Sequence, residues 1–528
     1  MDAMPGVDGT KGKETNTDTD NTNSRIKEGI APLDTTIVSA TPVVAPVAYC
    51  NINGYVTTTD PGPNQVNFQL GLPTLWNGRF LFVGNGGYAG SFASAQIPVV
   101  AGVIAGVATA ITDTGHQGVG IFDGSWALNE LAKQVDFQVR AVHVSTVASK
   151  AILHVFYDQA GVALFFGCST GGRQGLVEAQ QYPEDFDGII AGAPALGNWP
   201  AGFNWNMQQL TAAPENYIPP DKIALLDDAV MQHCDAIDGV VDGLIQDPRK
   251  CTFNPAKLRC KHGNTVDCLT AAQIQPLRAI YAGPSIEDED GEHIYAGFTK
   301  SDPAGPNGWA RWLTGFETPN GLGTSQPWMS PLVPPLQFPN QDHFLKFFVF
   351  SDPTYNSLTF DLANEEERAQ LAMVLNRGGA AATDPDLSAF INRGGKLLLY
   401  HGWSDPALSP LETIRYYKNV VRTMGGGVER IQDSVRLFMA PGMQHCGSGP
   451  GPNNFNPLPA LLSWVLTGTA PDQLIAVHFQ DNNPTTGVVT RSMPLCPYPE
   501  VAVFTGGDVN VAANWVCQRK KGKHRRGQ

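Results

Sequence analysis

The sequence predicts an α/β fold in which a mostly parallel sheet is covered by helices on both faces. Short apolar strands alternate with helical segments in the first third of the chain, and the same alternation resumes in the last quarter after a long interruption. This order is typical of parallel strands joined by helical crossovers. With 528 residues, the chain is long enough for a large core that carries an inserted domain.

The first part of the predicted core occupies residues 24–195. Its strands either alternate apolar and polar residues or form short apolar runs, and we expect them at 36–47, 54–72, 79–84, 162–167 and 188–194. Apolar residues recur at helical spacing over 135–157, which predicts an amphipathic helix. A second helix, 171–182, is expected directly after the fourth of these strands.

The strand–helix pattern breaks between residues 196 and 384. This segment has few long periodic elements, many Pro, Gly and Trp residues and four clustered cysteines, which predicts an inserted lid domain. The core then resumes over 385–518. We expect strands at 394–402 and 435–439, helices at 410–421 and 458–466, and a strand-like segment at 487–498.

Composition excludes several classes of function. The net charge of −14 disfavours a nucleic-acid partner, because no phosphate-neutralising surface is implied. No apolar run is long enough to span a membrane, so no membrane partner is expected. The polar residues 1–23 predict a disordered tail that does not resemble a signal peptide, and residues 519–528 predict a disordered basic tail, with surface adhesion as the alternative.

The nine cysteines favour an oxidising compartment. Sequence does not determine connectivity, but short spacings suggest three pairs, and a fourth pair would join the cysteines beside Ser169 and His445. The suggested pairs are Cys234–Cys251, Cys260–Cys268, Cys496–Cys517 and Cys168–Cys446. Cys50 is not included in these pairs. Four disulfides indicate a secreted or periplasmic protein; the alternative is that the cysteines are buried thiols.

A serine in a strand–turn–helix segment is the strongest chemical signal. Residues 167–171 read Gly-Cys-Ser-Thr-Gly, a G-x-S-x-G pattern whose glycines allow the tight turn that exposes Ser169. Serine is a weak nucleophile and needs a base within hydrogen-bond reach. We interpret Ser169 as the nucleophile rather than as an ordinary turn serine.

Downstream residues supply an acid and a base in the order Ser, Asp, His, which is the chain order of α/β-hydrolase triads. Asp405 follows the strand that ends near His401, and we expect it to orient the base; the alternative is an Asx turn before a proline. His445 follows a strand and a Pro-Gly loop and is the expected base. His401 and His116 are competitors, but both precede the acid.

The same chemistry requires two backbone N–H donors for the oxyanion. Thr170, next after the nucleophile, is one candidate, and Gly87 or Gly86 in the glycine-rich loop after strand 79–84 is the other. These glycines could instead cradle a phosphate, but no P-loop or dinucleotide-binding pattern follows them.

Cys168-Ser169, Asp405 and His445-Cys446 together resemble the CS-D-HC motif of the tannase and feruloyl esterase family, which includes mono(2-hydroxyethyl) terephthalate hydrolases. The resemblance extends from about residue 36 to 517. It implies an α/β-hydrolase core with a large inserted lid, no organic cofactor, and hydrolysis of small esters of aromatic acids. One departure is that no cysteine precedes Cys50 in this sequence, whereas family members often carry an N-terminal cysteine that pairs at the place of Cys50.

The resemblance leaves the substrate open. Feruloyl esterase or tannase activity is our leading hypothesis, and terephthalate monoester hydrolysis is the alternative within the family. A non-catalytic phenolic-binding protein is disfavoured by the intact triad, and a peptidase is disfavoured by the resemblance alone.

An acidic segment in the insertion suggests a structural Ca²⁺ site. Asp235, Asp238 and Asp242 are interrupted by glycines, and such oxygen ligands suit a hard cation. The family resemblance implies that the backbone carbonyls of Val240 and Leu244 complete the site. A solvated acidic turn is the alternative.

Aromatic residues in the insertion are candidates for substrate contacts. Trp309 and Trp312 could stack on an aromatic acyl group, and Arg311 could contact a carboxylate. Packing within the insertion is the alternative role for both tryptophans.

Overall fold

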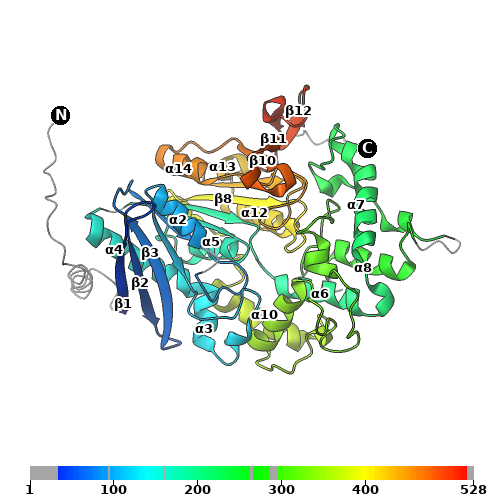
Figure 1. The fold of residues 1–528 in the computed structure, drawn as a ribbon, viewed down its shortest axis with the longest axis horizontal. Coiled ribbons are helices and arrows are strands. Elements are labelled where there is room, and N and C mark those ends of the chain that lie inside the picture. The colour runs from blue at the N-terminus through cyan, green and yellow to red at the C-terminus, as the bar shows by residue number, and fades with distance from the viewer. Residues whose placement is uncertain (1–33, 93–95, 160, 262–265, 286–293, 520–528) are drawn as a thin grey trace.

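A nine-stranded mixed sheet forms the centre of the computed structural model (Figure 1). The structure describes residues 34–92, 96–159, 161–261, 266–285 and 294–519. The strand order is β1-β2-β3-β5-β4-β6-β7-β8-β9. Neighbours in the part β1-β2-β3-β5 pair antiparallel, and neighbours in the part β5-β4-β6-β7-β8-β9 pair in parallel. The parallel strands are β4 (Arg79–Val83), β5 (Ala108–Thr112), β6 (Val162–Cys168), β7 (Gly188–Gly192), β8 (Lys396–Gly402) and β9 (Val435–Ala440).

The antiparallel edge of the sheet consists of β1 (Thr35–Val43), β2 (Tyr49–Thr58) and β3 (Asn64–Pro73). The single β segment expected over 54–72 is therefore two strands. They are separated by a turn that contains Pro61 and Pro63, and proline cannot donate to a strand ladder.

Helices cover both faces of the parallel strands, as expected for an α/β fold. Successive strand residues point to opposite faces: Phe80 and Phe82 join the larger core cluster, whereas Leu81 joins the cluster on the other face. The first cluster packs against α4 (Ala141–Tyr157), α5 (Thr170–Gln181), α11 (Ser388–Asn392) and α12 (Pro410–Met424), and the second against α2 (Gln96–Ile104) and α14 (Leu458–Thr467).

The helix expected over 135–157 is less regular than its periodicity predicts. It begins as α3 (Leu131–Val135), passes through a π-helical turn at residues 136–140 and continues as α4. The π-helical turn contains the buried Asp136, whose carboxylate binds Arg140, Thr58 and Asn64. The buried acid is thus anchored to β2 through Thr58 and to β3 through Asn64, at the place where the helix changes its winding.

The segment between β7 and β8 forms a largely helical body at one end of the sheet, drawn in green to yellow-green in Figure 1. Its helices are longer than the sequence led us to expect. The sequence pattern did not indicate α6 and α7, because each has a proline in its first turn and only weak apolar periodicity. The helices are α6 (Trp199–Thr211), α7 (Pro220–Cys234), α8 (Ala271–Ala282), α9 (Gln337–His343) and α10 (Glu365–Asn376). Much of this body packs around its own apolar core.

The C-terminal part adds α13 (Gly427–Ile431) and two small antiparallel sheets. These pair β10 (Leu474–Phe479) with β11 (Val489–Leu495), and β12 (Val501–Phe504) with β13 (Trp515–Gln518). The expected segment 487–498 corresponds to β11. The Cys496–Cys517 disulfide joins the end of this segment to β13.

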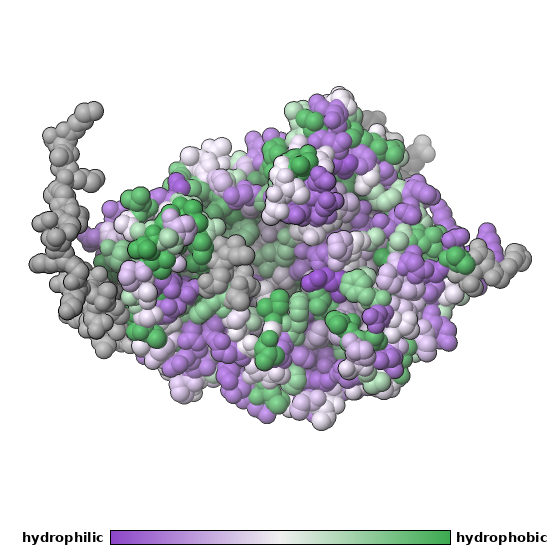
Figure 2. Space-filling model, in the orientation of Figure 1, coloured by the Kyte–Doolittle hydropathy of each residue, from purple (hydrophilic) through white to green (hydrophobic). Residues whose placement is uncertain are grey.

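The surface is mixed in character, and Figure 2 shows apolar residues gathered over α2, where Val100 and Ile104 are exposed. Within the described residues, none of the helices combines the length and apolar character required to cross a bilayer. The predicted tail 1–23 and residues 520–528 of the basic tail lie outside the described residues.

Candidate active site

Ser169 occupies a sharp turn between β6 and α5. Its φ of 64° is in the left-handed region, which costs energy for a serine and is typical of nucleophile turns. Glycines make the turn possible: a Cβ at Gly167 would lie 2.5 Å from the Gly171 carbonyl oxygen, and one at Gly172 would lie 2.2 Å from that of Gly192. The serine amide donates to the Gly192 carbonyl at 3.0 Å, which anchors the turn to β7.

Asp405 lies just beyond the end of β8 and is 2% exposed. Its Oδ1 accepts backbone N–H bonds from Ala407 (2.8 Å) and Leu408 (3.0 Å). Its Oδ2 lies 2.8 Å from His445 Nδ1 and 3.1 Å from His401 Nε2. Burial alone would raise the pKa of Asp405, but the charge of His445 and the hydrogen bonds from His401 and His445 outweigh burial and hold the pKa well below its usual value.

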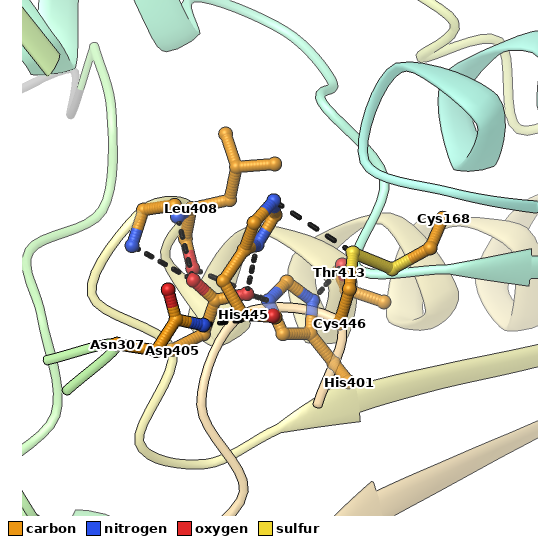
Figure 3. Close-up of a disulfide and its surroundings, with 9 residues drawn as sticks. Cys168, Asn307, His401, Asp405, Leu408, Thr413, His445 and Cys446 are labelled. Atoms are coloured by element: carbon orange, nitrogen blue, oxygen red, sulfur yellow. Dashed lines mark hydrogen bonds and ion pairs between the residues drawn. A yellow bond between two sulfur atoms is a disulfide. The ribbon is translucent and has the colours of Figure 1, made fainter. Parts of the chain in front are cut away.

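His445 follows β9 and directs Nδ1 at Asp405, as Figure 3 shows. With Nδ1 donating to the carboxylate, the other ring nitrogen, Nε2, is left to accept a proton. Asn307 donates to the His445 backbone carbonyl at 3.2 Å, and the Trp312 ring meets the imidazole edge-on at 4.9 Å between centroids. The insertion therefore contacts the candidate base directly.

His401 has a role that the sequence did not reveal. It is fully buried, and its Nδ1 lies 2.8 Å from the Thr413 hydroxyl, while its Nε2 reaches both Asp405 and the Leu408 carbonyl. Because a carbonyl can only accept, Nε2 carries the hydrogen and Nδ1 accepts from the threonine. The histidine that competed for the role of base instead donates to the acid; its spacing of four residues from Asp405 was the available signal.

His116, the other competitor, lies in a structural position. Its Nε2 donates to the Tyr88 carbonyl at 2.8 Å, and its ring stacks on Trp126 at 3.4 Å. Burial lowers the pKa of His116 to about 4. It therefore supports the glycine-rich loop as a neutral imidazole.

The Cys168–Cys446 disulfide joins the residue before Ser169 to the residue after His445, across 278 positions of sequence. Its Cys446 Sγ lies 3.7 Å from His445 Nε2 (Figure 3). The structure also contains the three other expected bonds, Cys234–Cys251, Cys260–Cys268 and Cys496–Cys517, so that only Cys50 lies outside the four disulfides.

The two candidate oxyanion donors lie in adjoining loops. The Thr170 hydroxyl donates to the Gly87 carbonyl at 2.7 Å, which ties the start of α5 to the glycine-rich loop. Among the described residues, no backbone carbonyl in a loop or turn accepts a hydrogen bond from the Thr170 or the Gly87 amide. Thr170 also lies in the first turn of α5, where an amide has no acceptor within the helix. Gly87 has a φ of 53°, and a Cβ added to Gly86, the other candidate, would meet nothing within 4 Å.

A cavity of about 310 Å³ opens at these residues and is lined by Ser169, His445 and all three candidate oxyanion residues. Trp312 and Arg311 also line it, as expected. Trp309 does not: it packs against Tyr281 and Phe298 in the core of the insertion, which is the alternative role considered for it. The other apolar lining residues include Tyr88, Phe122, Trp199, Phe203, Leu336 and Phe344.

Two arginines are among the residues that line the cavity, and none of the lining residues is Asp or Glu. Arg173 of α5 is buried and donates to the backbone carbonyls of Gln138 and Phe137, and burial lowers its pKa to about 10. Arg311 is exposed. The cavity therefore combines aromatic walls with positive charge.

The acidic segment of the insertion forms a loop whose carboxylates accept backbone N–H bonds. Asp235 accepts from residues 242 and 243, Asp238 from residues 240 and 246, and one oxygen of Asp242 from residue 244. The other oxygen of Asp242 is buried, has no hydrogen bond from the residues that the structure describes, and forms an ion pair with an Arg491 nitrogen at 3.7 Å. Burial raises the pKa of Asp242 to about 6. The oxygen-rich donor set of this loop is of the kind that a hard cation takes, although Arg491 already provides a positive charge beside Asp242.

The family model described as tannase and feruloyl esterase matches residues 50–518. The chain is 33% identical to the mono(2-hydroxyethyl) terephthalate hydrolase of Piscinibacter sakaiensis, over 89% of this chain and 84% of that protein. It is 29% identical to feruloyl esterase B of Aspergillus niger, over 93% and 90% of the two chains.

Solved structures show the same relationship. The crystal structure of feruloyl esterase B from Aspergillus oryzae aligns with a TM-score of 0.78 and 27% identity, covering 94% of this chain and 99% of that one. A tannin acyl hydrolase from Aspergillus niger shares the fold, with a TM-score of 0.69, 21% identity, and coverage of 92% and 90%. The chain belongs to the tannase and feruloyl esterase family and is a carboxylic ester hydrolase.

Proposed function

We propose that this enzyme hydrolyses esters of aromatic carboxylic acids, of the feruloyl esterase or tannase type, through an acyl-enzyme on Ser169. The observation that carries the proposal is the Asp405–His445 hydrogen bond at the edge of an aromatic-walled cavity that also contains Ser169. The names of the relatives support the same substrate class.

In the first half-reaction, His445 Nε2 accepts the Ser169 hydroxyl proton as Oγ attacks the ester carbonyl carbon. The carbonyl π electrons move onto oxygen, and the amides of Thr170 and Gly87 stabilise the resulting oxyanion. His445 then donates its proton to the leaving alcohol oxygen as the C–O bond breaks. The products are the free alcohol and an acylated Ser169.

In the second half-reaction, water takes the place of the alcohol. His445 accepts a proton from water as the hydroxyl oxygen attacks the acyl carbon, and then returns the proton to Ser169 Oγ as the aromatic acid leaves. Asp405 remains ionised throughout and stabilises the imidazolium. No step requires an organic cofactor or a metal.

The disulfide Cys168–Cys446 holds the nucleophile and the base in register in this proposal. Reduction is expected to abolish turnover at a reductant concentration that leaves the core folded, because both partners flank catalytic residues. Turnover and near-ultraviolet circular dichroism followed together along a reductant series test this expectation. Full activity after complete reduction of this bond would contradict it.

A structural Ca²⁺ in the acidic loop is a further part of the proposal. Asp235, Asp238 and Asp242 would bind it through side chains, and Val240 and Leu244 through carbonyls, within a loop closed by the Cys234–Cys251 disulfide. Bound Ca²⁺ would stabilise the insertion, which acts as the lid. We expect chelation to lower the melting temperature and Asp242→Asn to remove the Ca²⁺ dependence.

The four disulfides also support a secreted or periplasmic location, since such bonds persist in oxidising compartments.

Terephthalate monoester hydrolysis is the second candidate, and the arginines of the cavity favour it. Arg311 and Arg173 place positive charge in a cavity without lining carboxylates, which suits a substrate that carries a free carboxylate. The relative named as a terephthalate monoester hydrolase supports this alternative.

A panel of methyl ferulate, methyl gallate and mono(2-hydroxyethyl) terephthalate separates the candidates. We expect wild type to cleave at least one of them and Ser169→Ala to cleave none. Arg311→Ala should raise KM for the terephthalate ester selectively if its carboxylate is bound there. Failure of wild type to cleave any aromatic ester would favour a non-catalytic phenolic-binding protein instead.

A further inference from the structure

A second cluster of titratable side chains lies outside the active-site cavity. His143 of α4, Glu178 of α5 and Asp185 of the loop between α5 and β7 each place a ligand atom within 4.8 Å of the others. None of the three lines the active-site cavity, and Glu178 lies nine residues beyond Ser169, roughly 13 Å along the helix. The proposed reaction uses none of them.

Glu178 is the unusual member of this cluster. It is 0% exposed, and neither carboxylate oxygen has a hydrogen-bond partner among the described residues. Asp185 is also buried, and its Oδ2 lies 2.6 Å from His143 Nδ1. Two buried carboxylates at this separation repel each other unless a proton or a cation lies between them.

Neighbouring cations do not satisfy Glu178. Lys150 of α4 is near enough for its charge to oppose the rise in the pKa of Glu178, but it donates at 3.2 Å to the Glu184 backbone carbonyl rather than to the glutamate. The carboxylate is therefore directed at Asp185 without a donor, an arrangement that a shared proton or a bound cation would satisfy.

We propose that His143, Glu178 and Asp185 form a binding site for a divalent transition-metal cation of the zinc class. One imidazole nitrogen and two carboxylate oxygens are a donor set that Zn²⁺ accepts, whereas Ca²⁺ prefers six to eight oxygen ligands. The His143 side chain is 32% exposed, so that solvent can reach the site and provide a fourth ligand.

The surroundings fix the ligands in place. The His143 ring stacks on Tyr182 at 3.9 Å with an interplanar angle of 7°, which orients its Nδ1 toward Asp185. A bound cation would join α4, α5 and the loop that leads into β7. Since α5 begins at the nucleophile turn, the cation would stabilise the scaffold of the active site without entering the chemistry.

The experiment uses the full-length protein, which is stripped of metal with a chelator and returned to excess Ca²⁺. The excess keeps the proposed Ca²⁺ site in the acidic loop of the insertion occupied throughout. Zn²⁺ is then added, and binding is measured by calorimetry and thermal unfolding. We expect saturable one-to-one binding and a higher melting temperature. Glu178→Gln should weaken binding at least 100-fold and His143→Gln at least tenfold, because each removes a direct ligand.

Two matched variants control for charge and for surface histidines. Glu184→Gln removes a carboxylate that is 85% exposed in the same loop, and His154→Gln removes an exposed histidine of α4. Both should bind Zn²⁺ as wild type does. If Glu178→Gln fails to fold, His143→Gln carries the comparison, and visible absorption of Co²⁺ bound to wild type reports imidazole–carboxylate coordination.

Three results would overturn the proposal. The first is the absence of saturable Zn²⁺ binding to wild type, as expected if Glu178 and Asp185 share a proton. The second is unchanged affinity in both ligand variants. The third is binding that is lost in His154→Gln, which would place the cation on the surface of α4.

Discussion

Two buried carboxylates in the catalytic core, Asp405 and Glu178, are held in opposite ways. Asp405 accepts four hydrogen bonds, two of them from histidines, and its pKa is held well below the usual value. Glu178 accepts none from the described residues, and burial, together with the neighbouring Asp185 carboxyl, raises its pKa well above the usual value. Burial alone thus favours a neutral acid, and only donors directed at a carboxylate keep it charged. The chain supplies such donors where the chemistry needs an anion.

Replacing each acid by its amide gives the sharpest contrast. Asp405→Asn should lower kcat about 10⁴-fold, as the equivalent change does in a serine protease, because the histidine loses its orienting acceptor. Glu178→Gln should change kcat by less than about threefold, since no reacting group contacts it. Steady-state kinetics on the ester that wild type cleaves best measures both. Equal losses of kcat in the two variants would contradict the view that Asp405, and not Glu178, takes part in the reaction.

The proposed oxyanion loop offers a second contrast between adjacent residues. A Cβ at Gly87 would lie 2.0 Å from the Ile121 carbonyl oxygen, whereas one at Gly86 meets nothing within 4 Å. Gly87→Ala should displace the donor and lower kcat by about 10²–10³-fold, the cost of losing one oxyanion contact. Gly86→Ala should retain most activity. A fully active Gly87→Ala enzyme would exclude this loop as the oxyanion site.

His401 tests the contribution of a single donor to Asp405. His401→Leu removes the donor, and kcat is expected to fall about tenfold, equivalent to roughly 1.4 kcal/mol, with little change in KM. His401→Gln keeps an N–H donor and should recover much of the loss. A change confined to KM would place His401 in substrate binding rather than in orienting the acid.

The smallest effect concerns stability and pH. Because folding lowers the pKa of Asp405, its ionised form stabilises the fold above its unfolded pKa of about 3.9, and this stabilisation is lost as pH falls toward the folded pKa. The melting temperature of wild type should therefore exceed that of Asp405→Asn near neutral pH, with a gap that narrows below about pH 4. Calorimetry between pH 3 and 7 measures the gap, and widening on acidification would contradict the assignment.

Local patterns explain how much of the site could be predicted from the sequence. The strand, glycine turn and helix around Ser169 are contiguous, and the two other members of the proposed triad, Asp405 and His445, each come a few residues after a core strand. The four cysteine pairs were also inferred from spacing and position, and all four are present. Such features depend on neighbours along the chain.

The remainder depends on tertiary contacts. The sequence does not show that His401 and His445 converge on one carboxylate oxygen, or that Glu178 has no donor among the described residues. Trp309 and Trp312 are three positions apart in one short segment, yet one packs in the insertion core and the other lines the cavity. The packing of the insertion against the sheet determines which of the two tryptophans lines the cavity.

The central claim is that Ser169 carries the acyl group, and trapping that intermediate tests it most directly. Rapid quenching of wild type with an excess of the ester it cleaves best, followed by peptide mass spectrometry, should find the aromatic acyl mass on the peptide that contains Ser169. Ser169→Ala should show no adduct. An enzyme that turns over the ester with the adduct on another residue, or with the Ser169→Ala variant still active, would contradict the account.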